Sequence, residues 1–172
     1  LWQSPFPVIA AVGNHEILNQ GRSWYQKYFG KSYFSFSYGP DRFIVLDNAN
    51  DELSEGQLNW LENALKRPAR YRFIVMHKPP RNVIWFHAFD KGAKKLMQIA
   101  SKYKVNYVFL GHIHIYDRME YQNVIYLISG AAGAPMYRMP LYISPEGGAF
   151  NHFVGIQVSE QGIQEEIVRI QP

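Results

Sequence analysis

Asparagine and histidine side chains stand at the ends of three apolar runs in this 172-residue chain. Residues 7–12 precede Gly13-Asn14-His15-Glu16, residues 73–76 precede His77, and residues 106–110 precede Gly111-His112-Ile113-His114. Neutral imidazole nitrogens bind zinc, iron or manganese, and an asparagine carbonyl oxygen binds a metal without adding charge. In open α/β sheets, binding sites form in the crevice beyond the carboxyl ends of the strands. The pattern therefore predicts a metal site assembled from separated segments.

Each of these histidines has a structural alternative. His112 and His114 share one side if their segment is extended, and they diverge if the chain turns. Divergence would let them serve two metals, which in two-metal hydrolases lie roughly 3.5 to 4 Å apart. His15 could instead be a turn residue bonded to nearby backbone, and His77 a buried histidine satisfied by backbone. His152, at a predicted strand start, is expected to be structural.

Hydrophobic periodicity and turn residues predict the elements that must position these side chains. Strands are expected over 7–12, 33–38, 43–47, 71–76, 105–110, 123–128, 152–158 and 162–170, and helices over 54–67 and 91–103. Loops are expected at 80–90 and 130–150, the second longer than a structural connection usually needs. Helices separate the early strands and hairpins close the chain, so the pattern predicts an α/β fold.

Composition bounds the function classes. A chain of this length fits one domain that can fold without disulfides or structural zinc, and it contains no cysteine. Its net charge of +4 comes from scattered residues, so anionic ligands are weakly favoured and no specific nucleic-acid partner is expected. No apolar run approaches a membrane span and no signal segment is visible. We expect a soluble chain of unknown compartment, without a membrane partner.

The three blocks resemble, in order, three of the five signature blocks of the calcineurin-like metallophosphoesterases. They are Gly13-Asn14-His15-Glu16, the strand end Ile74–His77 and Gly111–His114, with spacings of 63 residues from Asn14 to His77 and 35 from His77 to His112. The continuation Ile115-Tyr116-Asp117-Arg118 is similar to the purple-acid-phosphatase-like branch. The resemblance implies a four-layer αββα sandwich, with mixed sheets flanked by helices. It also implies that residues 1–172 are the carboxyl-terminal portion of a single domain.

The resemblance also implies roles for the site residues. Asn14, His77 and His112 would bind one metal, His114 would bind the other, and His15 would act as general acid or charge stabiliser near the leaving-group oxygen. Two ions of manganese, iron or zinc would activate a water that hydrolyses a small-molecule phosphate ester. Further candidates form the rim of the substrate site: His87, Tyr116, Arg118 and Arg138. For Arg118, the alternative is a structural salt bridge to Asp117 or another acid.

In the family, two further blocks supply carboxylate ligands upstream of the Asn-His block. The 13 residues before Asn14 contain no acid and no histidine. We therefore expect a fragment that lacks the first strand-helix units, is inactive or weakly active alone, and holds at most one weakly bound metal. An uncovered sheet edge and apolar face predict self-association. The alternative functions are a non-catalytic binding or scaffold module and an anion- or nucleic-acid-binding domain, which the absence of a basic cluster disfavours.

Overall fold

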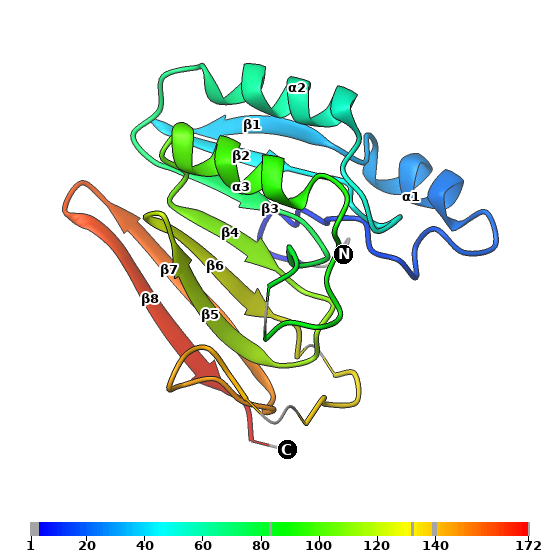
Figure 1. The fold of residues 1–172 in the computed structure, drawn as a ribbon, viewed down its shortest axis with the longest axis vertical. Helices are drawn as coiled ribbons and strands as arrows, with labels where there is room; N and C mark the ends of the chain where they lie inside the picture. Colours follow the sequence, from blue (N-terminus) through cyan, green and yellow to red (C-terminus); the bar gives the residue numbers. More distant parts are fainter. Residues whose placement is uncertain (1–3, 83, 132, 139–140, 172) are drawn as a thin grey trace.

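Two β-sheets stack face to face, and helices α2 and α3 cover the outer face of the larger sheet (Figure 1). The computed structural model describes residues 4–82, 84–131, 133–138 and 141–171. The larger sheet has the strand order β1-β2-β3-β4-β6-β5, and β7 and β8 form the second sheet. Strands β2, β3, β4 and β6 are parallel, while β1 and β5 pair antiparallel at the two edges. The carboxyl ends of the four parallel strands therefore meet at one edge.

The elements follow one another as α1 (Gly21–Phe29), β1 (Phe34–Tyr38), β2 (Asp41–Val45), α2 (Glu55–Leu65), β3 (Arg72–Val75), α3 (Ala93–Lys102), β4 (Tyr107–Leu110), β5 (Tyr116–Tyr121), β6 (Val124–Ser129), β7 (His152–Ser159) and β8 (Gly162–Arg169). None of the helices within the described residues has both the length and the apolar character of a membrane span.

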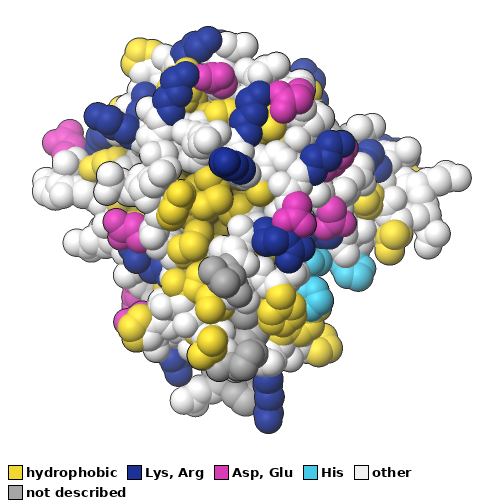
Figure 2. All heavy atoms as spheres, in the orientation of Figure 1, with side chains coloured by type: hydrophobic (Ala, Val, Ile, Leu, Met, Phe, Trp, Pro, Cys, Tyr) yellow, Lys and Arg dark blue, Asp and Glu magenta, His cyan; other side chains and the backbone are white. Residues whose placement is uncertain are grey.

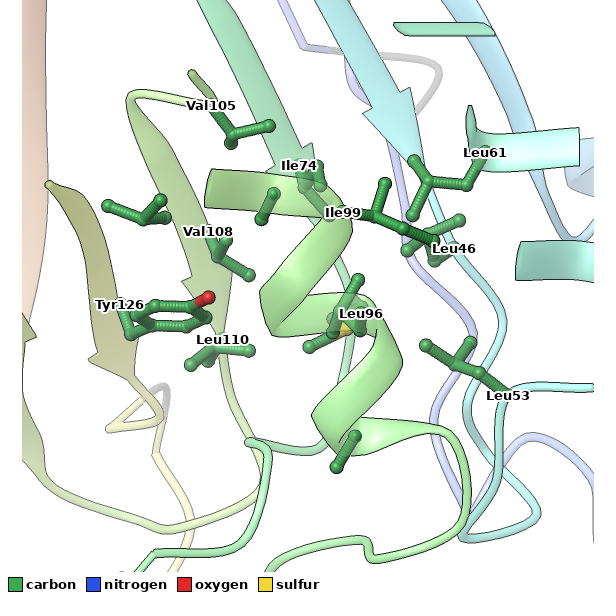
Figure 3. Packing of buried hydrophobic residues seen from close by; sticks show 14 of the residues in the cluster. Leu46, Leu53, Leu61, Ile74, Leu96, Ile99, Val105, Val108, Leu110 and Tyr126 are labelled. Carbon is green, nitrogen blue, oxygen red and sulfur yellow. The ribbon is translucent and has the colours of Figure 1, made fainter. Parts of the chain in front are cut away.

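The main core lies between the helices and the larger sheet. Ser54 caps α2, because its side chain accepts a hydrogen bond from the backbone N–H of Gln57 at 3.2 Å. The apolar stripes of both helices then face the strands. Figure 3 shows Leu96 and Ile99 of α3 packed among side chains of the sheet and of α2, including Leu46, Leu61, Ile74, Val108, Leu110 and Tyr126. This packing fixes the directions of β3 and β4, and hence the positions of their ends.

The opposite face of the larger sheet packs on the second sheet. Phe73, Tyr107, Tyr116 and Leu127 are buried there against side chains of β7 and β8. Each strand thus sends alternate residues into two different cores, as the two-residue period of a strand requires. The prediction of an α/β fold with mixed strands and flanking helices is confirmed, and the described residues supply its helix, sheet and sheet layers.

The predicted strand over 7–12 is wrong. These residues form no strand, and Val8 and Ile9 are exposed, at 49% and 46%. An apolar run becomes a strand only where another strand offers it a ladder of hydrogen bonds, and Pro7 can donate none. Only Val12 is fully buried, in a small cluster with Tyr25 and Ala49. Two strand ends, not three, therefore precede the candidate ligands.

Two elements were missing from the expected set. Helix α1 carries four aromatic residues, Trp24, Tyr25, Tyr28 and Phe29, of which only Tyr25 is buried, so it lacks the apolar stripe by which helices are recognised. Strand β5 pairs with β6 through a two-residue turn, Gln122-Asn123, and both turn residues have positive φ angles. That turn forces the hairpin although it contains no glycine. The other predicted elements are present, with ends shifted by up to two residues.

Candidate metal centre

Strands β3 and β4 bring His77 and His112 together. Their pairing continues past the assigned strands, because the N–H of Met76 donates to Phe109 O at 3.0 Å and the N–H of Gly111 donates to His77 O at 2.9 Å. His112 then adopts a left-handed conformation, with φ of 66°, which turns the chain sharply. The ring centroids of His77 and His112 lie 5.0 Å apart. The sheet itself therefore holds these two imidazoles in contact.

Asn14 completes a cluster of three side-chain atoms that could bind one metal ion. His77 Nε2 lies 2.8 Å from Asn14 Oδ1 and 3.1 Å from His112 Nδ1. A neutral imidazole nitrogen carries either one proton or one lone pair, so Nε2 can make one of these contacts as a normal hydrogen bond but not both. Two ligands bound at about 2.1 Å lie roughly 3.0 Å apart at octahedral angles and roughly 3.4 Å apart at tetrahedral angles, so the spacing fits a cation of octahedral geometry better. The residues present therefore fit a metal ion.

The protonation state of the two histidines also suits metal binding. Burial lowers the pKa of His77, although the nearby Glu16 carboxylate opposes the shift. Burial, followed by the neighbouring His77, lowers the pKa of His112 to about 4. Desolvation disfavours the charged imidazolium. Both rings are therefore neutral at pH 7, which is the form that ligates a metal.

Asn48 holds the backbone at His77. It lies just past the end of β2 and its side chain is fully buried. Its Oδ1 accepts from the backbone N–H groups of His77 and Lys78, each at 3.1 Å, and its Nδ2 donates to Lys78 O at 2.7 Å. Asn48 was not among the site residues predicted from the sequence. Its polar neighbours Asp47, Asn50 and Asp51 gave no local signal that would have separated Asn48 from an ordinary loop residue.

The Asn14 segment is held by Glu16 and by α1. The N–H of Gly13 donates to Glu16 Oε2 at 2.8 Å, and the Tyr25 hydroxyl donates to Ala10 O at 2.6 Å. A Cβ at position 13 would lie 2.7 Å from Glu16 Oε2 and 2.9 Å from His77 Cε1. Gly13 is therefore needed for close approach to His77, not for a left-handed turn. An irregular segment can place Asn14 because these contacts replace a strand's ladder.

His114 diverges from His112 and has its own support. Its Nδ1 lies 2.7 Å from Pro135 O, so it donates to that carbonyl and leaves Nε2 as the free ring nitrogen. The ring of Tyr137 stacks on it at 4.6 Å. The intervening Ile113 and the following Ile115 are fully buried, which turns both histidines away from the core. His114 thus offers the lone pair of Nε2 beside the cluster, but it is not one of the three atoms that converge there.

The remaining predicted residues fall in two groups. His15 is exposed and lines the same cavity as the cluster, and the His87 ring lies 6.3 Å from that of His112. Arg138 is exposed on the loop beside Tyr137. The structure does not bring Tyr116 or Arg118 to the cluster. Both face Glu165 on β8, with the Tyr116 hydroxyl 2.7 Å and Arg118 Nε 3.5 Å from its carboxylate.

A cavity of about 320 Å³ opens over the cluster and is lined by Asn14, His15, His77, Gly111, His112, His114, Ser129, Gly130 and Tyr137. Hollows of about 600 and 680 Å³ near Trp60 and Met97 are larger, but no histidine lines either. Histidine side chains gather at one edge of the surface in Figure 2. Within the described residues, no three His, Cys, Asp or Glu side chains converge. The cluster therefore consists of two histidines and an amide, without a carboxylate.

Comparison with known proteins identifies the family. The sequence profile described as calcineurin-like phosphoesterase matches residues 2–116. The chain belongs to the calcineurin-like phosphoesterase family. It is similar to serine/threonine-protein phosphatase CPPED1 of Pongo abelii, with 26% identity over 94% of this chain, and to purple acid phosphatase 23 of Arabidopsis thaliana, with 28% identity over 78%. The predicted family and its purple-acid-phosphatase-like branch are confirmed.

The fold agrees with this assignment. The structure of purple acid phosphatase PPD1 from yellow lupin superimposes with a TM-score of 0.59 at 21% identity, covering 74% of this phosphoesterase-family chain and 28% of the lupin chain. The chain spans 60% of the length of CPPED1 and 33% of purple acid phosphatase 23.

Proposed function

We propose that this chain carries the histidine half of a metal-dependent phosphoesterase site, as the carboxyl-terminal portion of one metallophosphoesterase domain. The observation that supports it is the convergence of Asn14 Oδ1, His77 Nε2 and His112 Nδ1. No placement of protons on neutral rings turns both contacts of His77 Nε2 into normal hydrogen bonds. Asn14, His77 and His112 would hold one metal ion, and His114 Nε2 a second. When bound, manganese, iron or zinc ions polarise phosphoryl oxygens and lower the pKa of a bound water.

The chain's own residues supply positioning and a proton. Asn48 and the β3–β4 pairing fix His77 and His112, and the Pro135 carbonyl fixes the ring of His114. His15 stands exposed on the same cavity, where its imidazole can donate a proton to the leaving-group oxygen or stabilise the charge on it. A general acid in such a position contributes typically 10²- to 10⁴-fold to the rate. The substrate class is a small-molecule phosphate ester.

A phosphatase assay of the longer protein that contains this chain tests the proposal. It uses a generic aryl phosphate with manganese, iron or zinc, and compares the parent with His15→Gln. The proposal predicts turnover that falls at least about 100-fold in the variant. The matched control is Asn50→Ala, because Asn50 is exposed and lines no part of the cavity, so it should leave the rate unchanged. No turnover with any of the three metals would reject catalysis and favour a binding or scaffold module that keeps the fold.

A further inference from the structure

Asp117 is a fully buried carboxylate whose hydrogen bonds reach two different loops. Its Oδ2 accepts from the indole Nε1–H of Trp85 at 2.7 Å. It also accepts the backbone N–H groups of Ile143 and Ser144, at 3.0 and 2.9 Å. The N–H of Arg118 donates to Oδ1 at 2.9 Å. One side chain at the start of β5 thus binds the loop before α3 and the loop after β6.

These bonds replace a counter-ion. The Arg118 guanidinium lies toward Glu165 and Glu120, and within the described residues no salt bridge involves Asp117. Burying a carboxylate without compensation is strongly unfavourable, so four N–H donors must stabilise its charge. Trp85 is itself fully buried, and its indole nitrogen can only donate. The arrangement is therefore specific for an ionised carboxylate at position 117.

The two loops meet beside the candidate metal centre. His87 lies two residues after Trp85, and its ring centroid is 5.4 Å from that of Tyr137. Tyr137, on the loop after β6, stacks on His114 at 4.6 Å, and His87 lies 6.3 Å from His112. Loop position therefore decides how these rings stand over the two histidines of the Gly-His-Ile-His segment.

We propose that Asp117 is a positioning residue that couples Trp85, on the loop before α3, to Ile143 and Ser144, on the loop after β6, and so sets the arrangement of His87 and Tyr137 at the mouth of the site. The carboxylate touches neither ring and acts only through Trp85, Ile143 and Ser144. The coupling does not require a bound metal, so it goes beyond the proposed function and can be tested without it.

Two variants separate the contact of Asp117 with Trp85 from its contacts with Ile143 and Ser144. Trp85→Phe keeps an aromatic ring at this buried position but removes the indole N–H that donates to Asp117, together with part of the ring volume. Asp117→Asn keeps the shape, but its NH₂ group would face N–H donors from both loops. The matched control is Asp90→Asn, which loses an exposed ion pair with Arg81 in the same loop and should matter little.

The readout is the carbon–proton NMR spectrum of the six histidine rings in the metal-free chain. We expect Trp85→Phe to shift the His87 signals most, Asp117→Asn to shift both His87 and His114, and Asp90→Asn to shift neither. His77, held by Asn48, should keep its signals in all three. Unchanged His87 and His114 signals in folded Asp117→Asn would overturn the proposal, as would equal shifts of all six histidines. If Asp117→Asn does not fold, an unchanged His87 in Trp85→Phe decides against the proposal.

Discussion

At the scale of single residues, Asn48 supports the candidate metal centre without offering it a ligand. Its amide satisfies two backbone N–H groups and one carbonyl at His77 and Lys78; the two bonds to Lys78 are buried and the bond to His77 is partly buried. Asn48→Ala would leave these groups without partners, at a cost of about 1 to 3 kcal/mol for each buried unsatisfied group. Three groups lose their partners, so we expect the free energy of unfolding, measured in urea, to fall by at least about 3 kcal/mol.

The control for this prediction is Asn50→Ala, two residues along the same loop. Asn50 is exposed, so its truncation should change the free energy of unfolding by less than about 0.5 kcal/mol. A loss below about 0.5 kcal/mol in both variants would show that the loop tolerates either change, and that Asn48 does not hold His77.

The residues that the sequence could predict are those whose role is local. The residue types of Gly111-His112-Ile113-His114 indicated ligands, but whether the two histidines share one side was left open from the sequence. In the structure the buried Ile113 and Ile115 turn both histidines outward. Asn48 and Asp117 accept hydrogen bonds from groups that are distant in sequence: Asn48 from the backbone N–H of His77, and Asp117 from the Trp85 indole and the backbone N–H of Ile143. Such partners are set by the three-dimensional fold. Tyr116 and Arg118 were predicted at the site from their place after the Gly-His-Ile-His segment. Their side chains instead point toward Glu165 in the second sheet.

At the scale of elements, the start of β2 is tied to the segment before β3 by Asp41. Its carboxylate accepts from Arg70 Nε at 2.9 Å and Nη2 at 2.6 Å, and from the N–H of Tyr71 at 3.2 Å. The hydrogen bond from Arg70 lowers the pKa of Asp41 below its ordinary value. A carboxyl whose pKa is lower in the folded state stabilises the fold above its unfolded pKa, and loses that contribution as the pH falls through the folded value.

This sign predicts a pH-dependent difference between the parent chain and Asp41→Asn. The parent should be more stable at pH 7, and the difference should shrink as the pH falls from about 4, the ordinary pKa of an aspartate, through the lower pKa of folded Asp41. Urea unfolding at pH 7, 5 and 3 measures it. A difference of equal size at all three values would mean that the Arg70 interaction does not depend on the charge of Asp41.

Elements were predictable where pattern and partner agree. The apolar residues that periodicity assigns to the inner faces of α2, α3, β3 and β4 are buried in the main core. Residues 7–12 have the composition of a strand but no paired neighbour in the described structure, and composition cannot supply one. Helix α1 was missed for the opposite reason: it has partners in the structure but no recognisable pattern in the sequence. It is held mainly by Tyr25 and by the ion pair of Arg22 with Asp47, and not by an apolar stripe.

At the scale of the whole molecule, apolar side chains are exposed over the amino-terminal part of the chain. Phe6, Leu18, Trp24 and Tyr28 are exposed by 75%, 57%, 54% and 65%. Exposed apolar groups that gather on one part of a surface favour association. We expect this chain to self-associate with rising concentration in sedimentation or size-exclusion measurements. Replacing Trp24 and Tyr28 by Glu should reduce association, and a monomer at all concentrations would contradict the expectation.

The whole-molecule layout also explains why the fold was more predictable than the site. Layers follow from the alternation of apolar residues along strands and helices, which can be read locally. The centre needs Asn14, His77 and His112 to converge from an irregular segment and two strand ends. The positions at strand ends predicted that candidate ligands meet, but only the family resemblance grouped these three on one metal, because no local pattern measures a distance across the sheet.

Metal titration of this chain tests the central claim most directly. We predict that one zinc ion binds weakly, as followed by calorimetry, and that Asn14→Ala, His77→Ala and His112→Ala each weaken binding by at least about tenfold. Asn50→Ala, the exposed counterpart of Asn14→Ala, should bind as the parent does. Equal zinc affinity in the parent and in all three cluster variants would show that Asn14, His77 and His112 do not form a metal centre.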